Sequence, residues 1–333
     1  MADGGDGTDE VLLANLGGEW ISRSVMGPLP EIAVSARYAW LRWGDTAVIA
    51  MANASGLVLL KPSQRHPLLT TTYGTGKLIR DAADRGAQHI WLAVGGSATV
   101  DGGVGAAMAL GWRFLDAQGK PVGHGGGELE RIERIERPDK WRIPAVEVLC
   151  DVNNPLCGEH GAARVFGPQK GATPAMVERL DAGLQHLAEL VKEQLGKVIA
   201  EIPGAGAAGG LAAGAVAFLD AQLVPGVETV MRASGLDVQL AGATWIITGE
   251  GSFDEQSLRG KVVSGVVRLA AKHSVKVGVL AGSVRADEKV CRREGIQVAL
   301  STMKPGMEVK EAMERAEELL AVTAREFAAQ LPA

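Results

Sequence analysis

The sequence is poor in cysteine, in aromatic residues and in long apolar runs, and each shortage excludes a class of protein. The 333 residues include three cysteines, Cys150, Cys157 and Cys291. So sparse and odd a set argues for a reducing compartment, and we expect buried thiols in a cytoplasmic protein. Aromatic residues make up 4% of the chain, which disfavours an aromatic-rich β sandwich. No run is long and apolar enough for a membrane helix, and the acidic first residues do not form a signal peptide.

The chain also lacks several signatures of partners and cofactors. Lysine and arginine number 34 against 39 acidic residues, a net charge of −5, and no long basic run is present, so nucleic acid is not an expected partner. Gly76-Lys77 and Gly260-Lys261 lack the upstream glycine and the following hydroxyl residue of a Walker A loop. No zinc-protease helix motif, nucleophile elbow or cluster of histidine and cysteine ligands occurs.

What the chain does have is glycine, at 44 residues, and short apolar runs that end in small or polar residues. Runs of this length are typical of strands covered on both faces, and six strands are predicted, at 46–50, 89–94, 146–150, 244–248, 277–281 and 297–300. One helix is expected to begin at Thr173-Pro174, because threonine caps helices and proline fits their first turn. Its predicted apolar stripe is Val177, Leu180, Leu184, Leu187 and Val191.

Two further helices are expected, one over residues 75–87 and one near the C-terminus. The apolar residues of the C-terminal helix recur at helical spacing, and we expect them to form its buried stripe: Val309, Met313, Ala316, Leu320 and Phe327. The charged run 128–140 is expected to be solvated surface.

The alternation of strands and helices predicts an α/β protein, and the length favours two domains. Residues 1–222 are expected to form a mixed α/β domain. Residues 223–333 are expected to form a Rossmann-like domain with a parallel sheet, because strand and helix alternate most regularly after Thr244. The stretch rich in glycine and alanine, 203–217, precedes the predicted boundary near residue 222.

The most informative segment is Gly95–Gly103, Gly-Gly-Ser-Ala-Thr-Val-Asp-Gly-Gly, directly after the predicted strand 89–94. Glycines let backbone N–H groups approach an anion closely. Ser97 and Thr99 offer further donors, and Asp101 offers a metal ligand or a proton acceptor. These parts suit a phosphate that is handled together with a cation.

Three other segments carry polar groups at the ends of predicted elements. Asp151-Val-Asn-Asn-Pro-Leu-Cys-Gly158, followed by 166–171, would either orient a small polar ligand or form an Asx turn closed by proline. Thr248-Gly-Glu-Gly-Ser-Phe-Asp254, then Arg259-Gly-Lys261, places a carboxylate and two cations before a helix, where anions bind well. Tyr73-Gly-Thr-Gly76 is either a loop or a ligand contact.

A fourth glycine pattern, Gly204-Ala-Gly206-Ala-Ala-Gly209, matches the dinucleotide-binding fingerprint. A long predicted helix precedes it where a strand is required. Close helix packing or a hinge is therefore the better interpretation.

Taken together, these segments resemble the bacterial glycerate kinases of the Gly-Gly-Ser-Ala-Thr type. The likeness follows the family's order through residues 2–8, 52–56, 70–76, 95–103, 150–155, 166–174, 203–210 and 248–261. It implies phosphorylation of D-glycerate by ATP with Mg²⁺, giving 2-phosphoglycerate or, in some members, 3-phosphoglycerate. It also implies two α/β domains, one of them Rossmann-like and discontinuous, with the site in the cleft between them.

Two departures from the family pattern are visible. Family members usually open with a strand and an Asp-Ser-Phe-Lys-Gly-Ser loop before Ala-Asp-Gly-Gly, whereas this sequence begins at the latter motif. The resemblance therefore implies that the family's N-terminal segment, with part of the Rossmann-like sheet, is absent here. Val100 stands where relatives often have asparagine.

The residues suggest a division of roles for this chemistry. Phosphate and substrate would be held by Gly95, Gly96, Ser97, Thr99, Asn153, Gly249, Gly251 and Arg259. Mg²⁺ would be held by Asp101 or Glu250. Lys261 or Arg259 would neutralise charge on the transferred group or pair with the substrate carboxylate, and Asp254 or Asp151 would orient the attacking hydroxyl and take its proton.

Alternatives stay open at this point. The chain could be a shortened, catalytically inactive ligand-binding form, or a nicotinamide-dependent oxidoreductase acting on small hydroxy acids. The expected partners are D-glycerate and ATP, with neither a nucleic acid nor a membrane, and a homodimer is an open hypothesis.

Overall fold

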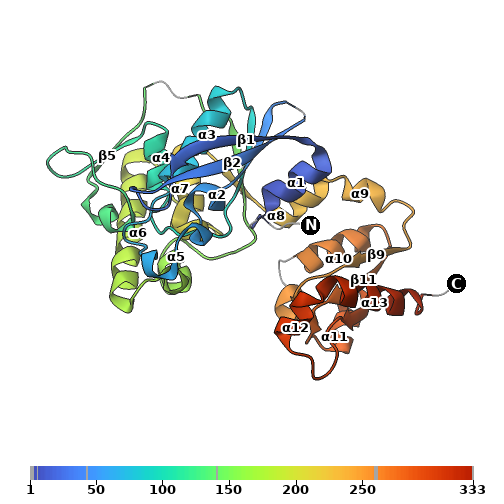
Figure 1. Ribbon diagram of the computed structural model, residues 1–333. Coiled ribbons are helices and arrows are strands. Elements are labelled where there is room, and N and C mark those ends of the chain that lie inside the picture. Colours follow the sequence, from blue (N-terminus) through green and yellow to red (C-terminus); the bar gives the residue numbers. More distant parts are fainter. Residues whose placement is uncertain (1–3, 6, 43, 140–141, 259–261, 332–333) are drawn as a thin grey trace. The chain divides into compact units, whose positions relative to one another are not determined.

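The computed structural model describes residues 4–5, 7–42, 44–139, 142–258 and 262–331, and the chain divides into two compact units, Met1–Val230 and Met231–Ala333 (Figure 1). The boundary expected near residue 222 falls at the start of strand β8 (Gln222–Val224). Since β8 pairs with β7 (Ala145–Leu149), this stretch belongs to the sheet of the first unit.

The first unit is built on a six-stranded mixed sheet with the order β1-β2-β3-β4-β7-β8. Its strands, besides β7 and β8, are β1 (Gly18–Met26), β2 (Ala33–Leu41), β3 (Thr46–Ala50) and β4 (His89–Ala93). The β1–β2 and β2–β3 pairs are antiparallel, and the pairs from β3 to β8 are parallel. A separate antiparallel pair joins β5 (Arg113–Leu115) to β6 (Arg134–Glu136).

Helices of the first unit are mostly short. The α-helices are α1 (Thr8–Leu16), α2 (Ala52–Ser55), α3 (Tyr73–Asp84), α4 (Val104–Ala109), α5 (Ala162–Phe166), α6 (Pro174–Leu195) and α7 (Leu211–Leu219). The 3₁₀ turns are η1 (Leu57–Leu59), η2 (Pro62–Gln64), η3 (Gly126–Arg131), η4 (Pro168–Lys170) and η5 (Ala207–Gly210). Helix α8 (Gly226–Ala233) crosses the division between the units.

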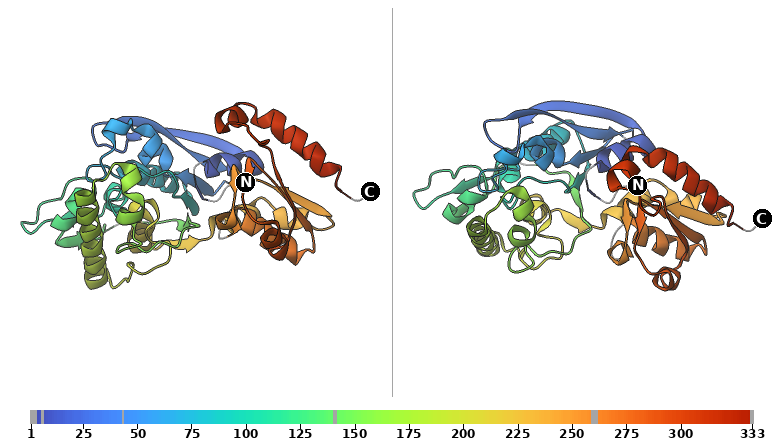
Figure 2. Two further views of the ribbon diagram at one scale, coloured as in Figure 1. Left: turned by 90° about the horizontal axis from the view of Figure 1, so that it is seen from below. Right: turned by 60° about the horizontal axis from the view of Figure 1, so that its bottom comes forward.

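The parallel strands and the longest helix form as their sequences predict. All of β3 is buried, as are most residues of β4 and β7, because helices and loops cover both faces of a parallel sheet. Helix α6, yellow-green in Figure 2, begins with Thr173 accepting a 3.3 Å hydrogen bond from the Met176 N–H and proline in its first turn. Its predicted stripe is buried: Val177, Leu180, Leu184, Leu187 and Val191.

The second unit holds a three-stranded parallel sheet with the order β13-β11-β9, as the alternation of strand and helix predicts. Its strands are β9 (Trp245–Thr248), β11 (Lys276–Ala281) and β13 (Ile296–Ser301), and a short parallel pair joins β10 (Ser252–Phe253) to β12 (Ser283–Val284). Its helices are α9 (Leu236–Gln239), η6 (Glu255–Leu258), α10 (Val262–Lys272), α11 (Glu288–Arg293), α12 (Val309–Glu314) and α13 (Ala316–Ala328).

The C-terminal helix departs from the prediction in two ways. It is broken at Arg315, whose φ of −108° and ψ of 19° are not helical. The predicted buried stripe is confirmed only at Phe327, because Met313 is 75% exposed and Leu320 47% exposed. The buried face of α13 carries Phe327 together with Leu319 and Thr323, at intervals of four residues.

Other differences concern the edges of the first unit. The long β1–β2 hairpin, drawn in blue in Figure 1, was not predicted, because most of β1 is exposed and carries no continuous apolar run. The charged run 128–140 is exposed at most of its described polar residues, but Leu129, Ile132 and Ile135 are buried. Among the described residues, no helix has both the length and the apolar character needed to span a membrane.

Candidate functional site

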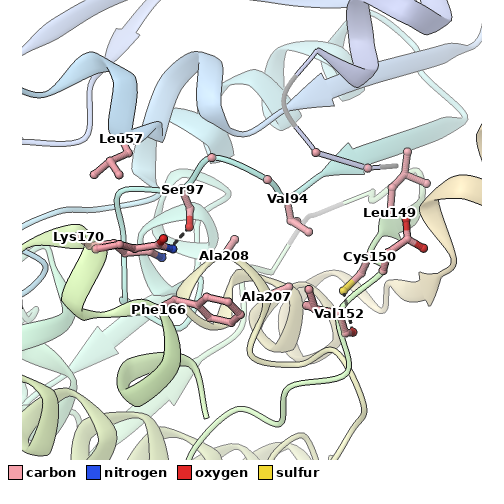
Figure 3. Close-up of a pocket in the computed structure, with 16 residues that line it drawn as sticks. Leu57, Val94, Ser97, Leu149, Cys150, Val152, Phe166, Lys170, Ala207 and Ala208 are labelled. Atoms are coloured by element: carbon pink, nitrogen blue, oxygen red, sulfur yellow. Dashed lines mark hydrogen bonds between the residues drawn. The ribbon is translucent and has the colours of Figure 1, made fainter. Parts of the chain in front are cut away.

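A pocket of about 390 Å³ opens in the first unit, beyond the carboxyl ends of β4 and β7 (Figure 3). This edge of a parallel sheet is where α/β proteins commonly bind ligands, because consecutive loops converge there. The lining residues come from six short segments: Gly4, Gly5, Leu57, Val94, Gly95, Gly96, Ser97, Leu149, Cys150, Asp151, Val152, Phe166, Gln169, Lys170, Ala207 and Ala208.

Lys170 is the cation of this pocket, and it is 1% exposed. Its Nζ donates hydrogen bonds of 2.7 Å to the Ser97 Oγ and of 2.7 Å to the Thr99 carbonyl oxygen. Figure 3 shows the Lys170 and Ser97 side chains meeting at one end of the pocket. The lysine therefore ties the turn η4 to the loop that follows β4.

Burial controls the charge of Lys170. Both of its hydrogen-bond acceptors are uncharged, so loss of hydration lowers the lysine pKa to about 7. The charge of Asp101 acts in the opposite direction and favours the ammonium form. Near neutral pH this lysine can therefore gain or lose a proton when the charge in the pocket changes.

Asp101, predicted as a metal ligand, lies in the protein interior at 1% exposure and does not line the pocket. Its carboxylate accepts hydrogen bonds from the Thr72 N–H (2.7 Å) and hydroxyl (2.9 Å) and from the backbone N–H groups of Gly103 and Gly105. Burial raises the pKa of Asp101, while the bonds from Thr72 oppose that shift. These contacts make Asp101 a structural anchor for the loop and argue against metal binding.

The small residues Gly95, Gly96 and Ser97 form the pocket wall next to Lys170. Gly96 has a φ of +69°, which glycine adopts without strain. Within the described part of the chain, no acceptor receives a hydrogen bond from the N–H of Gly96 or of Ser97. Two backbone donors thus remain for an anion, whereas the Gly95 N–H donates to the Gly4 carbonyl.

Thr99 and Asn153 stand outside the pocket lining. Thr99 is fully buried and contributes its carbonyl to Lys170, while its hydroxyl has no partner among the described residues. Asn153 is exposed on the loop after β7.

Asp151 lines the pocket and also caps a helix. Its two carboxylate oxygens accept hydrogen bonds from the N–H groups of Gly226 (3.0 Å) and Val227 (3.1 Å), at the first turn of α8. Asp151 thus connects the pocket lining to the start of α8.

The second unit carries the other predicted segment, at the end of β9. The turn at Gly249–Gly251 lies against β11 and the residues after it: a Cβ on Gly249 would be 2.1 Å from the Leu280 carbonyl oxygen, and the Glu250 carbonyl accepts the Gly282 N–H. The Glu250 Oε1 atom is buried and has no hydrogen-bond partner among the described residues. That orphaned oxygen is available to a cation.

Asp254 immediately precedes the turn η6. Its Oδ1 accepts a 3.2 Å hydrogen bond from the Ser257 N–H, and its own N–H donates to the Ser257 hydroxyl at 3.2 Å. The predicted cations Arg259 and Lys261 lie outside the described residues. Within the described chain, no three potential metal-binding side chains form a cluster.

Two glycine motifs serve packing. Gly204–Gly209 follows an irregular stretch rather than a strand, and a Cβ on Gly209 would lie 1.9 Å from the Thr99 carbonyl oxygen. Tyr73–Gly76 is the first turn of α3, where a Cβ on Gly76 would lie 2.3 Å from the Ala106 carbonyl oxygen. Both glycines permit close backbone approach, in agreement with the packing interpretation of the first motif.

Sequence reasoning missed Lys170 as a site residue. The segment 166–171 was singled out after Asp151, but nothing in its spacing indicates that the lysine is buried. The clue was weak: a lysine between short turns rich in glycine and proline, next to another segment of interest.

Comparison with known proteins gives concordant matches. Residues 1–332 match the model of a family described as the Glycerate kinase family. The chain is 47% identical to a glycerate kinase of Halalkalibacterium halodurans over 331 residues, covering 98% of this chain and 87% of that protein. It is 42% identical to the glycerate 2-kinase of Escherichia coli K12, covering 99% and 87%. A crystal structure from Salmonella typhimurium LT2, of a candidate glycerate kinase 2, superposes with a TM-score of 0.86 at 43% identity, covering 99% of this chain and 87% of that one.

Proposed function

Because the chain belongs to the glycerate kinase family, we propose that it transfers the γ-phosphoryl group of ATP to D-glycerate and forms 2-phosphoglycerate. The observation that supports this most directly is the pocket at the ends of β4 and β7, where Lys170, Ser97 and two free backbone N–H groups meet. The choice of product follows the E. coli relative, which is named a glycerate 2-kinase.

The reaction needs few covalent roles from the protein. The glycerate hydroxyl oxygen forms a bond to the γ-phosphorus, and the bond to the β,γ-bridging oxygen breaks, leaving its electron pair on ADP. The hydroxyl proton passes to a carboxylate, for which we propose Asp151, because it lines the pocket. Catalysis then depends on positioning and on charge neutralisation.

We assign the triphosphate to the segment after β9 in the second unit. Gly249 and Gly251 would admit phosphate oxygens, and Arg259 and Lys261 would neutralise their charge. Asp254, which precedes η6 at the end of this segment, would orient it through its bonds to Ser257.

The residues present fit a magnesium ion at Glu250. Mg²⁺ in nucleotide sites is usually held by one or two carboxylates together with substrate phosphates and water, so a three-carboxylate cluster is not required. The orphaned Glu250 Oε1 supplies such a ligand. When bound, the ion would neutralise charge on the phosphates.

The test is a coupled assay of ADP release with D-glycerate, ATP and Mg²⁺, and ³¹P NMR of the product distinguishes 2- from 3-phosphoglycerate. We expect turnover with D-glycerate and a 2-phosphoglycerate signal. Calorimetric binding of glycerate without turnover would contradict the kinase proposal and support a ligand-binding protein. Reduction of a nicotinamide cofactor by glycerate would support the oxidoreductase instead.

A further inference from the structure

Lys170 differs from every other cationic residue that the structure describes. It is the one lysine or arginine among them that is buried, and the other buried charged groups are aspartates. An ammonium group has three N–H donors. Two are used by the Ser97 hydroxyl and the Thr99 carbonyl, so one remains.

Among the described residues, no anion is in direct contact with the charge of Lys170. The carboxylate of Asp101 influences it through space, but that carboxylate is occupied by the N–H and hydroxyl groups of Thr72 and the N–H of Gly103 and Gly105. A buried ammonium without a contacting anion is costly unless a ligand supplies one. The pocket next to it is where such a ligand can enter.

We propose that Lys170 and Ser97 bind the carboxylate of the hydroxy-acid substrate, an inference that rests on the proposed function. One carboxylate oxygen accepts the third N–H of Lys170, and the other accepts the backbone N–H groups of Gly96 and Ser97. This set of donors matches the lone pairs of a carboxylate group.

The charges in the pocket select a monoanion over a nucleotide phosphate. Lys170 is the one cation among the described residues that line the pocket, Asp151 is an anion in the same lining, and Asp101 lies behind the loop. A triphosphate would bring several negative charges to a site with a single buried positive charge. A hydroxy acid brings one charge for Lys170 and a neutral hydroxyl for Asp151.

Substrate binding is therefore coupled to a proton. Two carboxylates from separate segments lie around Lys170: Asp101 follows β4, and Asp151, which follows β7, lines the same pocket. The backbone of Arg65 packs against the neighbouring Gly171. Burial holds the lysine pKa at about 7, so part of the free protein is uncharged there above neutral pH. A bound carboxylate favours the ammonium form, so one proton is taken up with the acid.

The experiment compares binding of D-glycerate with that of its uncharged amide, by calorimetry without nucleotide. The proteins are the wild type, Lys170→Met, Lys170→Arg and the control Lys192→Met, which removes an exposed lysine on α6. We expect Lys170→Met to weaken the binding of D-glycerate about 100-fold and to weaken the binding of the amide far less. Lys170→Arg should retain part of the affinity for the acid, and Lys192→Met should leave the affinity for both ligands unchanged.

Proton uptake on binding distinguishes the two roles, because a lysine with a purely structural role would not change the number of protons taken up with glycerate. Measured in two buffers of different ionisation enthalpy at mildly alkaline pH, the wild type should take up a proton with glycerate and Lys170→Met should not. The inference is overturned if Lys170→Met reduces the affinities for the acid and for the amide equally. It is also overturned if this variant loses affinity for Mg-ATP while its affinity for glycerate stays intact. Wild-type binding of glycerate without turnover contradicts the kinase proposal alone, and absence of any glycerate binding contradicts both.

Discussion

Lys170 carries a free-energy cost that depends on pH. Its ordinary pKa of 10.5 applies to the unfolded chain, and the folded value is about 7. Below pH 7 both states are protonated and the folded state bears the full cost of burying the charge. Between these two values the unfolded chain binds more protons than the folded one, so stability rises with pH.

Replacing Lys170 by methionine removes this dependence. We expect the free energy of unfolding of the wild type to rise, relative to Lys170→Met, by about 1.4 kcal/mol for each pH unit between 7 and 10. Urea denaturation of both proteins across this range measures the difference. A difference that stays constant with pH would show that burial does not lower the pKa of Lys170.

Gly209, at a φ of +65°, has no room for a side chain, because an added Cβ would lie 1.9 Å from the Thr99 carbonyl oxygen. We expect Gly209→Ala to destabilise the first unit by about 3 kcal/mol, because the methyl group meets the Thr99 carbonyl that also holds Lys170. Gly196 is the matched control, since it has a φ of +70° and nothing within 4 Å of its Cβ position. Gly196→Ala should cost only the backbone strain, about 1 kcal/mol, and equal costs in thermal denaturation would refute the steric explanation.

At the scale of elements, the candidate site residues lie at the carboxyl ends of parallel strands. β4 and β7 end side by side, and each continues into a segment that lines the pocket. In the second unit, β9 ends in the Glu250 turn, which is held against β11 by close backbone contact. The position of each segment is therefore set by the strand that precedes it as well as by the loop itself.

Helix α13 gives a prediction at this scale, because it presents neighbouring leucines to different surroundings. Leu319 is 5% exposed and Leu320 is 47% exposed. We expect Leu319→Ala to destabilise the second unit by about 3 kcal/mol and Leu320→Ala by less than about 1 kcal/mol. Circular dichroism during urea denaturation distinguishes the two, and the reverse ranking would mean that the helix is rotated from the described position.

For the whole molecule, the two units have separate sheets and separate hydrophobic cores. The pocket next to Lys170 is formed within the first unit, and the proposed phosphate segment belongs to the second. Helix α8 joins them, and its first turn is held by Asp151 of the pocket. One residue thus takes part in the pocket and in the connection.

This division predicts where each substrate protects the backbone. D-glycerate alone should slow hydrogen exchange at residues 94–97, 149–152 and 166–170, because binding stabilises the closed state of those segments. Mg-ATP should slow exchange at residues 248–258. Mass spectrometry of exchange with each ligand measures this, and protection by glycerate confined to the second unit would contradict the assignment.

Much of the architecture could be predicted because it follows from local chemistry. Continuous apolar runs indicated β3, β4, β7, β9, β11 and β13, and a threonine–proline pair marked the start of α6. The β1–β2 hairpin was not predicted, because most residues of β1 are exposed and form no continuous apolar run. The stripe of α13 was predicted correctly only at Phe327, because apolar spacing there fits two faces of a helix and packing decides which face is buried.

The sequence by itself determined the α/β alternation, the glycine loop after β4 and the family resemblance, because propensity and motif are properties of neighbouring residues. Tertiary structure alone decided that Asp101 anchors a loop and that Lys170, some seventy residues beyond Ser97, supplies the charge beside it. The reason is physical: burial and the distance between charges set the role of an ionisable group, and both arise only when separate segments pack together.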